Sequence, residues 1–285
     1  MSLLLSGLVL YQQTVVTIGT QEFQSGTTGI SPYNYYWESR RVQFVYTAAE
    51  INAAGGFAGD ISAIAFDVSQ VNGGDLVNYT VSMAHTSATD ASSHNTATLT
   101  TVKNAHTLTP GTTGWRTITF DNNFLWNGTD NILVDVCWGV NSGWASNGQV
   151  WLYNNVSNQM RGVYSSSSNQ CGTTTTTTRN GKPRVQFTIT STANMTYQSS
   201  TTEQASTSPV IIGSTNQPVI RLNVVTSGSQ NPFDVTSITF TTSGTTNTSD
   251  LTAAKVYYTT STTFSTANQF GTTINNPNGT LTFTG

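Results

Sequence analysis

The residues that could do chemistry are few in this 285-residue chain, and they lie far apart. The three histidines, His85, His94 and His106, have neither the i, i+4 spacing nor the glutamate of a helical zinc site. The sequence also contains no nucleophile elbow and no glycine-rich phosphate loop. We therefore expect a protein that is not an enzyme.

Two cysteines, Cys137 and Cys171, are the only ones in the chain. They do not cluster with histidine as the ligands of a structural zinc site do, so we predict a disulfide, with two buried free thiols as the alternative. In the chain-entropy treatment, closing a loop of this length stabilises a fold by about 3–4 kcal/mol. Because disulfides persist in oxidising compartments, we expect a secreted protein, extracellular or at the cell surface.

Asp135 lies in a strand-like run in which Ile132, Val134, Val136 and Trp138 form one face, with Leu133, Asp135 and Cys137 on the other. A buried carboxylate must be paired or bound to a metal, so Asp135 could hold calcium together with loop carbonyl groups. The alternative is a carboxylate that faces solvent or an arginine. We expect no other cofactor.

The densest aromatic run of the chain lies at residues 31–38. Tyr35, Tyr36 and Trp37, together with Trp144, could stack on sugar rings, because aromatic faces offer a large area with little rotamer loss. The run opens with a proline turn, which favours the other interpretation, that these rings pack a loop onto the fold.

The elements that position these residues are predicted to be strands. Only 8% of the residues are charged and 36% are hydrophobic, while threonine and serine are abundant, and almost no segment has helical periodicity. The fold class is therefore all-β, and the length suffices for two domains. A net charge of −3 with scattered basic residues gives no surface for nucleic acid.

One short helix is predicted within residues 44–68. Thr47 and Glu50 have the spacing of a capping box, and Gly55-Gly56 supplies a left-handed exit. After it, Ile64, Phe66 and Val68 alternate with smaller residues, which is the period of a strand.

Four segments of the first two thirds carry a family resemblance. They are TVVTIG at 14–19, YTAAEINAAGG at 46–56, WRTITF at 115–120 and FLWNGTDNI at 124–132. Roughly residues 14–190 resemble a module of large secreted and surface proteins of Bacteroidetes. The resemblance implies a jelly-roll β-sandwich of adhesin type in a protein exported by type IX secretion. It brings no catalytic residue.

The last third resembles a second family. Its segments GSTNQPVI at 213–220, VTSGS at 225–229 and AKVYYT at 254–259 are similar to the immunoglobulin-like module found N-terminal to BNR-repeat neuraminidase domains. The resemblance implies an immunoglobulin-like β-sandwich that is incomplete at its C-terminus. The propeller that would carry sialidase chemistry is absent from the sequence.

The predicted organisation has four parts: an apolar segment at 1–13, a jelly-roll domain at 14–190, a linker at 191–194 and an immunoglobulin-like domain at 195–285. The first segment resembles a signal-peptide remnant or a strand, and it is too short to span a bilayer, so no membrane span is expected. We predict that Leu3–Leu10 is extended and buried against protein, within the first domain or across a subunit boundary.

The function expected from these features is that of a non-catalytic secreted surface protein, an adhesin, stalk or filament-forming module. Its partners would be other surface or matrix proteins, or glycans, and it could self-associate by strand addition at an open sheet edge. The alternative is a set of carbohydrate-binding or spacer domains of a larger secreted glycosidase.

Overall fold

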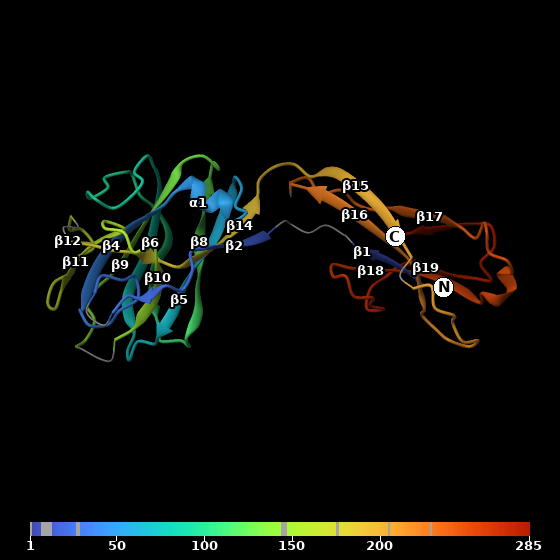
Figure 1. Ribbon diagram of the computed structural model, residues 1–285, viewed down its shortest axis with the longest axis horizontal. Helices are drawn as coiled ribbons and strands as arrows, with labels where there is room; N and C mark the ends of the chain where they lie inside the picture. The colour runs from blue at the N-terminus through green and yellow to red at the C-terminus, as the bar shows by residue number, and fades with distance from the viewer. Residues whose placement is uncertain are drawn as a thin grey trace. The chain divides into compact units, whose positions relative to one another are not determined.

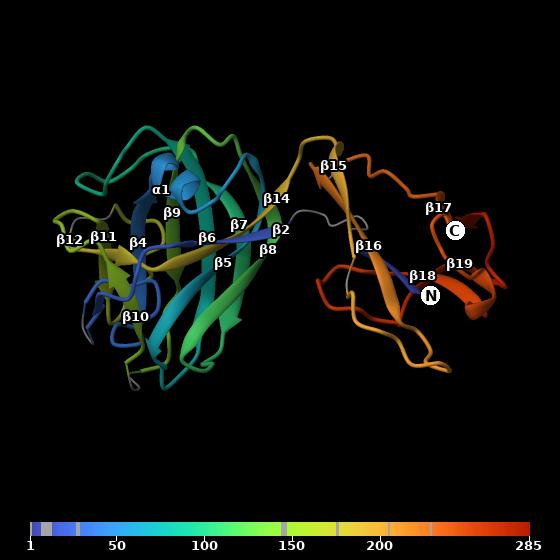
Figure 2. The same ribbon diagram turned by 45° about the vertical axis from the view of Figure 1, so that its right-hand side comes forward.

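A computed structural model describes the backbone of residues 2–6 and all of residues 13–26, 29–143, 147–174, 177–204, 206–228 and 230–285. The chain divides into two compact units. The large domain is Gln13–Ser191, and the small domain combines Thr192–Gly285 with the N-terminal segment. Both are built from strands, as Figures 1 and 2 show, and the predicted all-β class is confirmed. No helix within the described ranges is long and apolar enough to cross a membrane.

The large domain consists of two antiparallel sheets. One has the order β13-β10-β5-β14-β2, with β3 paired to β10 and β8 paired to β5. Its strands are β2 (Gln13–Ile18), β3 (Phe23–Gln24), β5 (Gly59–Gln70), β8 (Gly114–Trp126), β10 (Gln149–Tyr153), β13 (Lys182–Pro183) and β14 (Val185–Ser191). The other has the order β12-β11-β4-β9-β6-β7. Its strands are β4 (Ser39–Tyr46), β6 (Leu76–Thr86), β7 (Thr100–Leu108), β9 (Asn131–Trp138), β11 (Met160–Ser165) and β12 (Thr177–Arg179).

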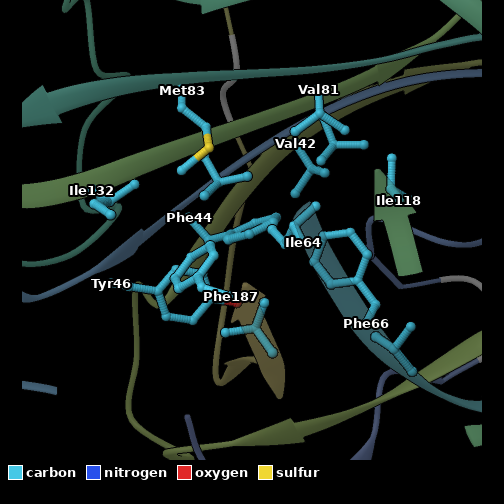
Figure 3. Close-up of a cluster of buried hydrophobic side chains, with 14 of the residues drawn as sticks. Val42, Phe44, Tyr46, Ile64, Phe66, Val81, Met83, Ile118, Ile132 and Phe187 are labelled. Atoms are coloured by element: carbon cyan, nitrogen blue, oxygen red, sulfur yellow. The ribbon is translucent and has the colours of Figure 1, made fainter. Parts of the chain in front are cut away.

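A single hydrophobic core joins these two sheets into a sandwich (Figure 3). Phe44 on β4 meets Phe66 on β5 edge to face, with 5.9 Å between ring centroids. Tyr46 on β4 meets Phe187 on β14 in the same manner at 5.4 Å. Such pairs add to the stabilisation from buried area, and here each pair connects the two sheets.

The predicted helix is confirmed as α1 (Ala48–Ala53). The backbone N–H of Glu50 donates to the Thr47 hydroxyl at 3.2 Å, and the Thr47 N–H donates to the Glu50 carboxylate at 2.9 Å, which completes the capping box. Gly55 has a φ of +89°, the left-handed exit that its position requires. The helix ends there, and β5 follows.

The small domain contains a sheet with the order β15-β16-β1-β18-β19 and a separate pair, β17-β20. Its strands are β1 (Ser2–Ser6), β15 (Thr196–Glu203), β16 (Pro218–Ser227), β17 (Ser237–Thr241), β18 (Ala253–Thr259), β19 (Gln269–Asn275) and β20 (Thr280–Thr284), with a 3-10 turn at Thr248–Asp250. Apolar side chains from both sheets, among them Val256, Phe270, Leu281 and Phe283, form one core.

The N-terminal strand β1 lies between β16 and β18 and runs parallel to both. The expected extended conformation is thus confirmed for residues 2–6, while residues 7–12 lie outside the described residues. The expected place within the first domain was wrong, because β1 belongs to the small domain. A strand between β16 and β18 pairs backbone groups that would otherwise line two open edges, which is a physical reason for this position.

Candidate functional site

Three neighbouring strands of the large domain bring Tyr164, Arg40 and Trp138 into one row. Arg40 on β4 is the register partner of Tyr164 on β11 and of Trp138 on β9. Its guanidinium carbon lies 5.7 Å from the centroid of each ring, within cation–π range. Tyr164 is 41% exposed, whereas Arg40 and Trp138 are fully buried, so the row leads from the surface into the core.

Aromatic rings extend this row at the surface. Trp37 stacks on Tyr164 with 4.3 Å between centroids, and Tyr36 meets Trp37 edge to face at 5.0 Å. Tyr36 is 37% exposed, but Tyr35 is buried in the core, so Tyr35 is not accessible for the stacking contact proposed from the sequence. Trp144 lies outside the described residues. The structure therefore brings together two of the four predicted residues and adds Tyr164.

The predicted disulfide between Cys137 and Cys171 is confirmed, with 5.5 Å between the two Cα atoms. It fastens the segment after β11 beside the Arg40 row. The same segment is held by its Gln170 N–H, which donates to the Ser39 hydroxyl at 3.0 Å, and by Arg41, whose Nη1 donates to the Thr173 carbonyl at 2.9 Å. The loop next to the aromatic rings is therefore attached at three points.

Asp135 pairs with Arg41, as expected from the alternative to the calcium interpretation. Its carboxylate is 3.0 Å from Arg41 Nε and accepts a hydrogen bond from Gln43 Nε2 at 2.8 Å. Burial raises the pKa of Asp135, and the nearby Arg41 charge opposes that rise. Within the described ranges, no group of three or more metal-ligating His, Cys, Asp or Glu side chains comes together.

A second charged pair, not foreseen from the sequence, links α1 to the end of the sandwich. Lys182 on β13 is almost fully buried; its Nζ lies 2.7 Å from Glu50 Oε2 and donates to the Val45 carbonyl at 2.9 Å. Tyr153 donates its hydroxyl to the other Glu50 oxygen at 3.0 Å. Burial lowers the pKa of Lys182, and Glu50 opposes that shift. All polar atoms of this cluster have partners, so its role is structural.

The small domain has an open groove of about 580 Å³ beside β16 and the β17–β20 pair. Its lining is apolar and hydroxyl-bearing: Val219, Ile220, Thr239, Phe240, Thr241, Thr242, Thr245 and Thr280. Threonine hydroxyls can donate and accept hydrogen bonds but do not titrate near neutral pH. The groove is thus suited to binding rather than to acid–base chemistry.

Comparison with known proteins gives one finding for the small domain. No curated protein matches the chain. Residues 198–276 match the family described as the N-terminal domain of BNR-repeat neuraminidase. The matched segment runs from within β15 to just beyond β19. The resemblance predicted for the last third of the sequence is confirmed, and the small domain is similar to an accessory domain of neuraminidases.

Proposed function

We propose that this chain is the non-catalytic, accessory part of a larger secreted glycosidase. The observation that carries the proposal is the match of residues 198–276 to the N-terminal domain of BNR-repeat neuraminidase. The Cys137–Cys171 disulfide supports a secreted, extracellular location, because disulfides persist in oxidising compartments. In this proposal the small domain is a spacer, and the large domain contacts the glycan.

The glycan-contacting surface is the aromatic group of Tyr36, Trp37 and Tyr164. Two of the three rings, Tyr36 and Tyr164, are more than a third exposed, and Trp37 contacts both: it stacks on Tyr164 and meets Tyr36 edge to face. Aromatic faces bind sugar rings because they offer rigid apolar area beside polar groups.

The proposal is tested by measuring binding of the whole chain to a glycan array, together with its hydrolysis of a fluorogenic sialoside. We expect binding without hydrolysis. Replacing Trp37→Ala should weaken binding about tenfold or more, because truncating an aromatic anchor of a binding surface costs roughly 2 kcal/mol or more. The matched control is Trp115→Ala, which should leave binding unchanged. Trp115 is a half-buried tryptophan on β8, and its ring centroid lies 4.6 Å from Arg184 Cζ. Equal losses in both variants, or no binding at all, would refute the glycan-contacting role.

A second candidate is a surface adhesin, stalk or filament module exported by type IX secretion. It is supported by the resemblance of residues 14–190 to Bacteroidetes surface modules. The position of β1 favours self-association, because a sheet that accepts a separate N-terminal strand can accept the same strand from a second copy. Light scattering after size exclusion should then show oligomers that a Leu4→Pro variant lacks, since proline is not tolerated in a central strand. A monomer at all concentrations would count against this candidate.

A further inference from the structure

The Arg40 side chain has an unsatisfied hydrogen-bonding edge. It is fully buried, and Nη1 donates to the Gly29 carbonyl, but Nε and Nη2 have no hydrogen-bond partner. Among the described residues, no carboxylate forms an ion pair with it. Buried charges are normally paired, and an unpaired one is costly. This arginine therefore differs from Arg41 and Arg184, each of which has an aspartate partner.

Two neighbouring tryptophans also have unsatisfied hydrogen-bond donors. The indole N–H groups of Trp37 and Trp138 are also buried without a hydrogen-bond partner. Trp138 lies under the Arg40 guanidinium, and Trp37 stacks on Tyr164, the other ring beside it. Buried donors without acceptors indicate a missing acceptor, and a site that combines them with a positive charge selects an anion.

A second cation strengthens this preference. A Cβ atom on Gly29 would collide with the Arg179 guanidinium, so Arg179 packs against the same residue whose carbonyl accepts from Arg40. Burial and the Arg179 charge lower the pKa of Arg40 to about 9, which leaves it protonated at neutral pH. Two guanidinium groups thus adjoin one backbone position.

We propose that Arg40 binds the carboxylate or sulfate group of an acidic sugar, and that Trp37 and Tyr164 contact the sugar ring. Nε–H and Nη2–H form one edge of the guanidinium, and this edge matches the two oxygens of such a group bidentately. Tyr164 is the exposed ring beside the buried Arg40 guanidinium, so the proposal requires the Tyr164 ring to turn aside when the ligand enters. This inference rests on the proposed glycan binding and specifies the class of glycan.

The test is an array that carries matched pairs of sugars differing only by a carboxylate or a sulfate, for example glucose and glucuronate. The whole chain should bind the acidic member about 10- to 100-fold more tightly, the range expected for a charged hydrogen-bonded pair. In Arg40→Met the preference should disappear. Arg116→Met, which removes a half-buried arginine on β8, is the matched control and should keep it.

Stability measurements distinguish this role from a structural one. Replacing an unpaired buried charge with an apolar side chain of similar size is neutral or stabilising, so ligand-free Arg40→Met should melt at or above the wild-type temperature. A large drop in melting temperature would assign Arg40 to folding and overturn the inference. Equal binding of acidic and neutral sugars would also overturn it, while leaving the proposed glycan binding intact. An array with no bound glycan would instead refute the proposed function.

Discussion

Replacing Glu50→Gln should show how strongly the buried Lys182 depends on its partner. The substitution keeps the size of the side chain and an oxygen that can still accept from the Thr47 N–H, so the helix cap is preserved. It removes the negative charge 2.7 Å from Lys182 Nζ. Any loss of stability then reports on the charge pair rather than on the helix.

The expected loss of unfolding free energy is about 3 kcal/mol at pH 7. Removing one member of a buried ion pair costs about 3–5 kcal/mol, because the other charge stays buried without a partner. The Lys182 side chain is 2% exposed, but that of Glu50 is 26% exposed, and partial access of water places the value at the lower end. The Val45 carbonyl still accepts from Lys182, which also limits the loss.

The difference in stability between Glu50→Gln and the wild type should depend on pH in two ways. Burial alone would raise the pKa of Glu50, but the charge and hydrogen bond of Lys182 lower it below its ordinary value of 4.5. The stability that this carboxylate contributes is therefore present above pH 4.5 and is lost as the pH falls through the lower, folded-state pKa. In the variant, burial still holds the pKa of Lys182 below its ordinary value of 10.5. As the pH rises, the folded state therefore loses the Lys182 proton before the unfolded state does, and the variant regains stability up to about pH 10.5.

The assay is urea unfolding followed by tryptophan fluorescence. All six tryptophans lie between residues 37 and 151, so the signal reports on the large domain alone. Asp75→Asn, at an exposed loop position, is the control and should change stability by less than about 0.5 kcal/mol. The double variant Glu50→Gln/Lys182→Met should recover most of the loss, because it leaves no unpaired charge. A loss below about 1 kcal/mol in Glu50→Gln would refute this reasoning.

Three further predictions concern the same domain. Without reductant, denatured protein should show no alkylatable thiol, and reduction should lower the unfolding free energy by about 3–4 kcal/mol; two free thiols would contradict the disulfide. Thr47→Ala should cost about 1 kcal/mol in urea unfolding, because a helical N–H loses its acceptor, and an unchanged midpoint would disprove the cap. EDTA should leave the melting temperature unchanged, since the Asp135 carboxylate binds Arg41 and Gln43. Asp135→Asn should lower the unfolding free energy by about 3 kcal/mol, because it leaves Arg41 unpaired. A melting temperature that depends on calcium would instead assign Asp135 to a calcium site.

Local features of the fold could be predicted from the sequence because their determinants lie close together in the chain. The capping box needs only Thr47 and Glu50, and the core face of β9 follows from the alternation of Ile132, Val134 and Val136, all buried as expected. The same alternation did not reveal that Leu133 is also buried. Leu133 belongs to a separate cluster with Val45 and Ala84, on the other face of that sheet.

The parts of the candidate site that escaped prediction depend on strand register. Two adjacent arginines follow Ser39 at the start of β4. Nothing local distinguishes Arg40, which lies between two aromatic rings, from Arg41, which pairs with Asp135. Tyr164 belongs to the candidate site only because the register of β11 aligns it with Arg40 on β4. The pairing of Lys182 with Glu50 likewise joins residues 132 positions apart. Such contacts arise from topology, which hydrophobic periodicity does not encode.

Because β1 pairs with strands that follow the large domain in the sequence, the two domains should fold one after the other. Leu4 pairs with Arg221 and Tyr257, so β1 can join its sheet only after the far later residues of β16 and β18 have been synthesised. The large domain, which lies between them in sequence, can fold as soon as residue 191 has emerged from the ribosome or translocon. Contacts of such sequence separation form slowly. The small domain should therefore fold after the large domain and more slowly.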